Sequence, residues 1–198
     1  GRPVTCTIDV AADYLAVGSD DDFVRVPLTP TTAVKAAALL GGTLPTRKMV
    51  DAIDAAAEVR LEPRPLTEKR EAFATFVAHN AIIEQQRAGR PASGLVTGVK
   101  KDVVLTNRLL EKDGRVAIYG WRKLDGTPIQ PLTTVHQAYY VDYSHGARVV
   151  SRVVTVDGKE RMIEDVLADP KLHVLLSDEG PVTAPAAKYQ AAAAATVP

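Results

Sequence analysis

The sequence of 198 residues contains a single cysteine, Cys6, which excludes an internal disulfide and a cysteine-based metal cluster. No apolar run approaches the length of about 18 residues that a membrane-spanning helix needs. Neither sign of charge is in excess, because 24 lysines and arginines balance 24 aspartates and glutamates. Since binding to phosphate backbones needs a concentration of positive charge, we expect no nucleic-acid partner.

Motifs of known chemistry are missing as well. The chain has no cofactor-binding loop, no H-E-x-x-H zinc motif and no G-x-S-x-G turn for a nucleophilic serine. The three consecutive residues Asp20, Asp21 and Asp22 lack the D-x-D-x-D-G spacing of a calcium loop, so we interpret them as an exposed hairpin turn. We therefore expect no cofactor and no bound metal.

What the chain does contain is the composition of a globular protein with a core, at 46% hydrophobic and 24% charged residues. Threonines before a proline or an apolar helical pattern predict the starts of two helices, at Thr29 and Thr46. A third helix is expected between Thr67 and Arg87. Apolar alternation and Asp-Gly turns predict strands at 4–10, 14–17, 23–26, 95–99, 103–106, 116–121, 135–144, 147–156 and 159–163, followed by a helical segment at 164–176.

The short spacing of these strands predicts antiparallel pairing and not βαβ units, so the expected class is α+β. We expect a helical N-terminal lobe, at 28–62, packed on an antiparallel β-sheet of about five or six strands in the sheet-rich part at 94–163. Residues 1–180 then form a single α+β domain. The alanine-rich end, 181–198, has little to bury and is expected to be a disordered tail.

The stretch 135–146, V-H-Q-A-Y-Y-V-D-Y-S-H-G, is the part of the chain densest in reactive side chains. As an extended strand, it places His136 and Asp142 on one face, about 20 Å apart, and His145 on the other face. That geometry excludes a self-contained triad of Asp142, Ser144 and His145. Gly146 permits a sharp exit from the strand, which turns His145 toward a cleft.

A site in this stretch therefore needs partners from other elements. We expect His145 to act as the catalytic base and Asp142 or Asn80 to orient it. Tyr143 and His136 are expected to line the cleft, and the helix around His79 is expected to form its opposite wall. The candidate substrate-binding residues offer rings for stacking or cations for a carboxylate, and they are Tyr140, Lys100, Trp121 and Arg148. Each of these roles has a structural alternative. The tyrosines can be core and rim residues that favour β-strands, and His79 can be a hydrogen-bonded histidine of the core.

A helix with the polar pair His79-Asn80, followed by an antiparallel sheet with histidines, resembles the order of elements in papain-like cell-wall peptidases. No cysteine opens the expected central helix, and Cys6 lies in an expected strand, so no catalytic residue is carried over from this resemblance. Our hypothesis is a hydrolase, or a lyase with the same His/Tyr chemistry, that acts on a cell-envelope or extracellular polymer, peptide or glycan, by His-centred acid/base catalysis. The alternatives are a non-catalytic saccharide- or protein-binding module that uses a Tyr/Trp-rich sheet face, and a His-ligated metalloenzyme.

The sequence begins with Gly-Arg-Pro and not with methionine, which indicates removal of an N-terminal segment by signal-peptide cleavage or by deliberate truncation. Together with the single cysteine and the alanine-rich end, this favours a secreted or periplasmic bacterial protein, with the cytoplasm as the alternative. The expected partner is a polymeric or small-molecule substrate. The pattern of residues does not indicate an oligomeric state.

Overall fold

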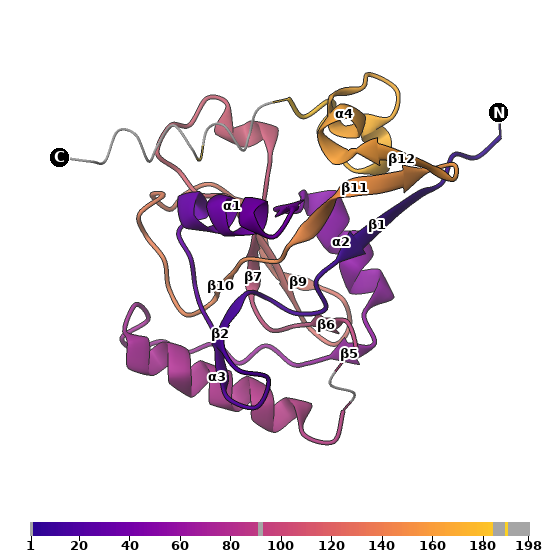
Figure 1. Ribbon diagram of the computed structural model, residues 1–198. Helices are drawn as coiled ribbons and strands as arrows, with labels where there is room; N and C mark the ends of the chain where they lie inside the picture. Colours follow the sequence, from indigo (N-terminus) through magenta and orange to yellow (C-terminus); the bar gives the residue numbers. More distant parts are fainter. Residues whose placement is uncertain (1, 91–92, 184–188, 190–198) are drawn as a thin grey trace.

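The computed structural model describes residues 2–90, 93–183 and 189. Within them, four α-helices and twelve β-strands form a mixed fold, so the expected α+β class is confirmed (Figure 1). The helices are α1 (Pro30–Leu39), α2 (Arg47–Ala56), α3 (Phe73–Arg87) and α4 (Ile163–Ala168), with two short 3-10 helices, η1 (Asn107–Leu109) and η2 (His173–Leu175). The strands are β1 (Cys6–Val10), β2 (Ala16–Gly18), β3 (Phe23–Arg25), β4 (Gly42–Thr43), β5 (Val59–Arg60), β6 (Val96–Thr97), β7 (Lys101–Val103), β8 (Ile118–Arg122), β9 (Pro128–Thr133), β10 (His145–Gly146), β11 (Val150–Val156) and β12 (Lys159–Met162).

Most of the strands of the described chain belong to two four-stranded sheets. In the first, β11 lies between β1 and β12 and also pairs with β4, and all of these pairs are antiparallel. The second has the order β10-β7-β8-β9, in which β10 pairs with β7 in parallel and the other pairs are antiparallel. Strands β2 and β3 form the expected hairpin, whose acidic turn is exposed.

Threonine caps fix the starts of α1 and α2 where the sequence predicts them. The hydroxyl of Thr29 accepts a hydrogen bond from the backbone N–H of Thr32 at 3.4 Å, and the hydroxyl of Thr46 accepts one from Met49 at 3.3 Å. Such bonds satisfy N–H groups that lack a partner inside the helix. Because α2 packs against β8 and β4 joins the first sheet, the predicted helical lobe is in direct contact with both sheets.

Helix α3 begins at Phe73, later than the start signal at Thr67 predicts, and it has no side-chain cap bond. It buries His79, Asn80 and Ile83 and packs against β3. At 15 residues it is the longest helix of the described chain. Among the described residues, no helix combines the length and the apolar character that crossing a membrane requires.

The strand predicted at 135–144 is wrong. The chain makes two tight turns there, in which the backbone N–H of Tyr140 donates to the carbonyl of Gln137 at 3.0 Å and that of His145 donates to the carbonyl of Asp142 at 3.1 Å. The predictions also omit β9, which contains Pro128 and Pro131. Strand β9 lies at the edge of the second sheet, and one of its sides has no neighbouring strand. A proline, which has no N–H to donate, is tolerated at such an edge.

The described part of the C-terminal region is held by the core. Tyr189 is 1% exposed, and its hydroxyl donates to the carbonyl of Val104 at 2.8 Å and accepts from the N–H of Ala117 at 3.0 Å. Val182 is also buried and bonds to the backbone of Leu167. The prediction of a loose tail is therefore wrong at these two residues, and 184–188 and 190–198 lie outside the described residues.

Candidate functional site

Two turns in 135–146 gather side chains that an extended strand would separate. The ring of Tyr140 stacks on that of His136, with centroids 4.6 Å apart and planes inclined by 19°. The ring of His145 lies 6.1 Å from His136 and 5.9 Å from Tyr140. Because the Tyr140 hydroxyl also bonds to Asp142, the predicted wide separation of His136 from Asp142 is wrong. We call His136, Tyr140, Asp142 and His145 the histidine cluster.

Asp142 anchors the histidine cluster through both carboxylate oxygens. Oδ2 accepts hydrogen bonds from the Tyr140 hydroxyl at 3.0 Å and from Nε and Nη2 of Arg70 at 3.1 and 2.7 Å. Oδ1 accepts from the N–H and the hydroxyl of Ser144 at 2.8 and 2.5 Å. Burial opposes ionisation, but the bonds from Ser144 and Arg70 outweigh it and hold the pKa of Asp142 well below its usual value. Asp142 is thus a carboxylate that positions its neighbours.

The two imidazoles of the cluster are held in their neutral form. His145 is fully buried, so the expectation that Gly146 turns it toward a cleft is wrong. Neither of its ring nitrogens has a hydrogen-bond partner among the described residues. Burial, followed by the charges of Lys101 and Lys100, lowers the pKa of His145 to about 4 against the opposing effect of Asp142. Burial and Lys101 also lower the pKa of the half-buried His136. Both imidazoles are therefore neutral near pH 7.

Two cations, Arg70 and Lys101, complete the surroundings of the cluster, and Arg70 is not among the candidates predicted from the sequence. Arg70 lies before α3 in a charged stretch that is typical of a solvated surface, yet it reaches Asp142 across 72 positions of sequence. Lys101 lies beside His145 in the β7–β10 pair, and its Nζ is 5.8 Å from the centroid of the Trp121 ring. The sequence does contain one signal for Lys101. Adjacent side chains of an extended strand point to opposite faces, so Lys100 and Lys101 are expected in different environments.

His79 lies in an aromatic layer within the protein. Its ring is 4.8 Å from Tyr143 and 5.8 Å from Trp121, and all three side chains are buried. Burial, Lys100 and Arg25 lower the pKa of His79 to about 3. Since Nε1 of Trp121 donates to a backbone carbonyl and its ring is 3% exposed, the structure does not offer this ring for stacking on a sugar. The layer supports the second sheet from the α3 side.

Three further candidates are bound into the interior. Asn80 accepts hydrogen bonds from the backbone and the guanidinium of Arg25 through Oδ1. Lys100 is 1% exposed, and its Nζ donates to the carbonyl of Tyr143. Arg148, also 1% exposed, donates to three backbone carbonyls. These three side chains therefore form hydrogen bonds inside the protein. They are not at the surface, where they would have to lie to bind a substrate.

Among the described residues, no group of three histidine, cysteine, aspartate or glutamate side chains is arranged to hold a metal ion. His173 belongs to η2, where its Nδ1 lies 3.0 Å from the carbonyl oxygen of Asp169. Burial raises the pKa of the Cys6 thiol, which disfavours the reactive thiolate. The histidine cluster therefore gathers two imidazoles, the side chains whose usual pKa lies nearest neutrality.

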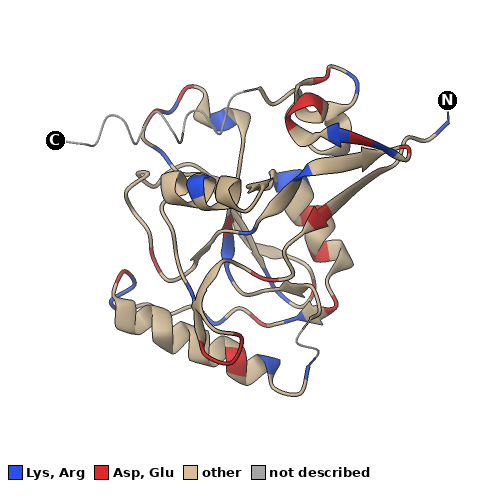
Figure 2. Ribbon diagram, in the orientation of Figure 1, with Lys and Arg blue, Asp and Glu red and all other residues tan. Residues whose placement is uncertain are grey.

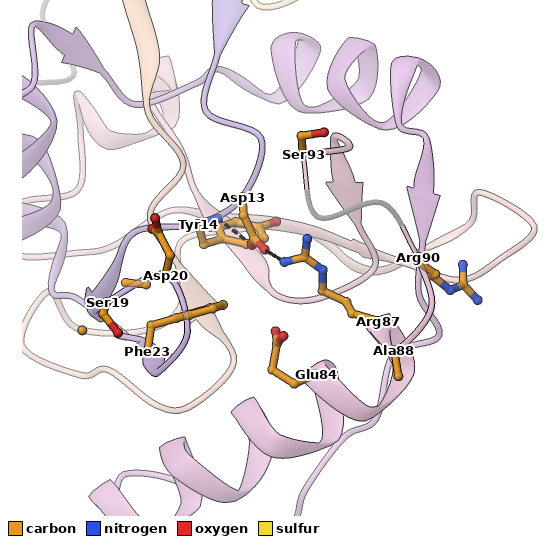
Figure 3. A pocket seen from close by; sticks show the side chains of 12 residues that line it. Asp13, Tyr14, Ser19, Asp20, Phe23, Glu84, Arg87, Ala88, Arg90 and Ser93 are labelled. Atoms are coloured by element: carbon orange, nitrogen blue, oxygen red, sulfur yellow. Dashed lines mark hydrogen bonds and ion pairs between the residues drawn. The ribbon is translucent and has the colours of Figure 1, made fainter.

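A separate cavity of about 720 Å³ lies between α3 and the β2–β3 hairpin (Figure 3). Its lining includes Asp13, Tyr14, Phe23, Glu84 and Arg87. No member of the histidine cluster is among its lining residues in the described chain. The structure thus holds two distinct polar regions, the histidine cluster and this cavity.

No protein-family model matches the chain, and no curated protein or solved structure is significantly similar to it. Function is therefore inferred from the geometry and chemistry of these two regions.

Proposed function

We propose that the chain is a hydrolase that uses acid/base catalysis at the histidine cluster and acts on a peptide or glycan polymer of the cell envelope or the extracellular space. The observation that supports this proposal is the convergence of two imidazoles and a phenol beside Lys101. Buried polar groups in folded proteins are normally hydrogen-bonded, and exceptions concentrate at functional sites. Both ring nitrogens of His145 are such exceptions within the described residues.

In the proposed reaction, His136 replaces His145, the base expected from the sequence, because His136 is half-buried whereas His145 is inaccessible. The neutral imidazole of His136 takes a proton from a water molecule as the water oxygen attacks the electrophilic carbon of the substrate. The resulting imidazolium gives that proton to the leaving group, so the enzyme ends the cycle in its starting state. The ammonium group of Lys101 stabilises negative charge that develops on a substrate oxygen.

The remaining members of the cluster act as positioning residues. Tyr140 stacks on His136 and is itself fixed by its hydrogen bond to Asp142. His145 fills the space behind both rings. A catalytic group must be held within a fraction of an ångström of its working position, and such a packed support supplies that precision.

Exposed apolar surface in the segment that carries the cluster favours a polymeric substrate over a small one. Val135, which precedes His136, is 66% exposed, and Tyr139, which precedes Tyr140, is 78% exposed. A long chain can lie across such a surface, whereas a small molecule usually needs an enclosing cavity. A substrate of the cell envelope is consistent with a secreted or periplasmic protein.

The test compares His136→Gln with His173→Gln, which removes a histidine outside the cluster. The substrates are p-nitrophenyl acetate, an ester that imidazole hydrolyses, and purified bacterial cell-wall sacculi. We expect His136→Gln to lower both rates by about 100-fold or more and His173→Gln to leave them unchanged. The wild-type rate should rise with pH to a plateau near neutrality, because the lowered pKa of His136 leaves its imidazole neutral there. Equal rates for the two variants contradict the proposal, as does the absence of turnover with both substrates.

A second candidate function is a non-catalytic module that binds a saccharide. The exposure of Tyr139 favours it, because an exposed aromatic ring can stack on the apolar face of a sugar. Binding to immobilised glycans that Tyr139→Ser abolishes, without any turnover, would select this function. Binding that is equal for Tyr139→Ser and the wild type would remove it.

A further inference from the structure

The cavity between α3 and the β2–β3 hairpin carries charges of both signs and takes no part in the proposed hydrolysis (Figure 3). Its volume, about 720 Å³, lies in the range of small-molecule binding sites, roughly 300–1,000 Å³. Helix α3 contributes Glu84 and Arg87 to one wall, and the hairpin contributes Ser19, Asp20 and Phe23 to the other. Figure 2 shows the acidic hairpin turn beside the charged end of α3.

The inner part of the cavity is an ion-paired network. Arg25, whose side chain is fully buried, lies 2.6 Å from Asp13 and 2.8 Å from Glu84. Arg87 binds the same Asp13 oxygen at 3.0 Å. Two carboxylates and two guanidinium groups cancel each other, so this network joins α3 to the hairpin without leaving net charge for a ligand.

The rim of the cavity differs from its inner part. Asp20 continues into Asp21 and Asp22 at the exposed hairpin turn, and no ion pair reaches these three carboxylates in the part of the chain that the structure describes. Arg90 follows α3, and one of its N–H groups donates to the carbonyl of Arg60 at 2.9 Å. Figure 3 shows Asp20 and Arg90 on opposite sides of the hollow. Charges of opposite sign thus lie on opposite sides of the hollow.

We propose that this cavity binds a short zwitterionic peptide, with its amino group beside Asp20 and its carboxylate beside Arg90. Opposite charges on two sides of an opening favour a ligand with two separated charges over a simple cation or anion. The rings of Tyr14 and Phe23 offer apolar surface for the part of the ligand between its charged ends. This inference is independent of the proposed hydrolysis, because the two regions share no residue.

The test is isothermal titration calorimetry of the whole chain with trialanine, N-acetyl-trialanine and trialanine amide. An exposed ion pair contributes up to about 1 kcal/mol, so blocking either end of the peptide should weaken binding by about fivefold. In the variant D20N/D21N/D22N, acetylation of the peptide should no longer weaken binding, whereas amidation should weaken it as in the wild type. In Arg90→Gln, amidation should no longer weaken binding, whereas acetylation should weaken it as in the wild type.

A matched control is the variant K159Q/E160Q, which changes charges of both signs on the exposed strand β12. We expect it to bind all three peptides as the wild type does. The proposal is overturned if trialanine gives no saturable heat, if the blocked peptides bind as well as the free one, or if each rim variant weakens all three peptides equally. Thermal unfolding of every variant, followed by circular dichroism, shows that the rim substitutions leave the fold intact.

Discussion

The Arg25 network and the histidine cluster are both buried and polar, but they differ in how their polar groups are satisfied. The guanidinium of Arg25 binds Asp13, Asn80 and Glu84. In contrast, the ring nitrogens of His145 have no partner among the described residues. A buried guanidinium with several partners holds elements together, whereas an imidazole with neither nitrogen bonded is an energetic cost to folding. The difference favours a structural role for Arg25 and supports the catalytic role proposed for the histidine cluster.

The largest effect on stability is expected from Arg25→Met. The substitution removes a buried cation from the partly exposed carboxylates of Asp13 and Glu84 and from the amide of Asn80, so the free energy of unfolding should fall by about 3 kcal/mol. Urea denaturation measures the change. Arg152→Met is the matched control, because Arg152 pairs with Glu164 at the surface and its loss should cost less than about 1 kcal/mol. Equal losses for the two variants would contradict a structural role for the Arg25 network.

Acid should destabilise the fold through the buried imidazoles. The pKa is lowered to about 4 for His145 and to about 3 for His79, whereas an unfolded histidine has a pKa near 6.5. Between these values the unfolded chain binds protons that the folded chain does not, so stability falls as the pH falls below 6.5. For His145 the loss approaches about 3 kcal/mol near pH 4. Urea denaturation across this range should show a shallower pH dependence in His145→Gln and His79→Gln than in the wild type.

His173→Gln serves as the control for this pH series, since His173 lies in η2 and is only partly buried. It should retain most of the wild-type slope. If all three variants retain that slope, then the two buried imidazoles are not its cause. The shape of the pH profile thus separates a neutral histidine cluster from a charged one.

A moderate effect is expected from Asp142→Asn. The amide keeps the shape of the side chain but loses the charge-assisted bonds with Arg70, so the free energy of unfolding should fall by about 2 kcal/mol. A double-mutant cycle with Arg70→Gln measures the coupling directly. A coupling energy near zero would remove Asp142 as the anchor of the cluster.

The smallest effect on stability is expected from His136→Gln. His136 is half-buried and has a stacking neighbour in Tyr140, so its replacement should change the free energy of unfolding by less than about 1 kcal/mol. The loss of catalytic rate proposed above then occurs in a stable protein. A large loss of stability would instead place His136 with the structural side chains of the Arg25 network.

Local signals in the sequence predicted the elements whose stability is local. The hydroxyls of Thr29 and Thr46 cap their helices as expected, and the acidic turn at 20–22 joins β2 to β3. These features depend on hydrogen bonds and backbone preferences within a few residues. The sequence pattern was less informative at 135–144, where aromatic and β-branched residues resemble a strand although the chain forms turns.

The candidate site was predicted only in part, because its composition is local but its geometry is not. Its densest segment, 135–146, is visible in the sequence, and His136, Tyr140, Asp142 and His145 do lie together. Their arrangement was not predictable from alternation along a strand. Nor does the local sequence around Arg70 distinguish it from the solvated charges beside it, because its partner Asp142 lies 72 positions away.

The sequence by itself determined the α+β class, the capped helices and the place where reactive side chains concentrate. Only the tertiary structure decided that His145 is buried without a partner, that Arg70 holds Asp142 ionised, and that Tyr189 belongs to the core. The physical reason is the range of the forces. Backbone preferences and capping act between near neighbours, whereas burial and the pKa values that follow from it depend on side chains that only the complete fold brings together.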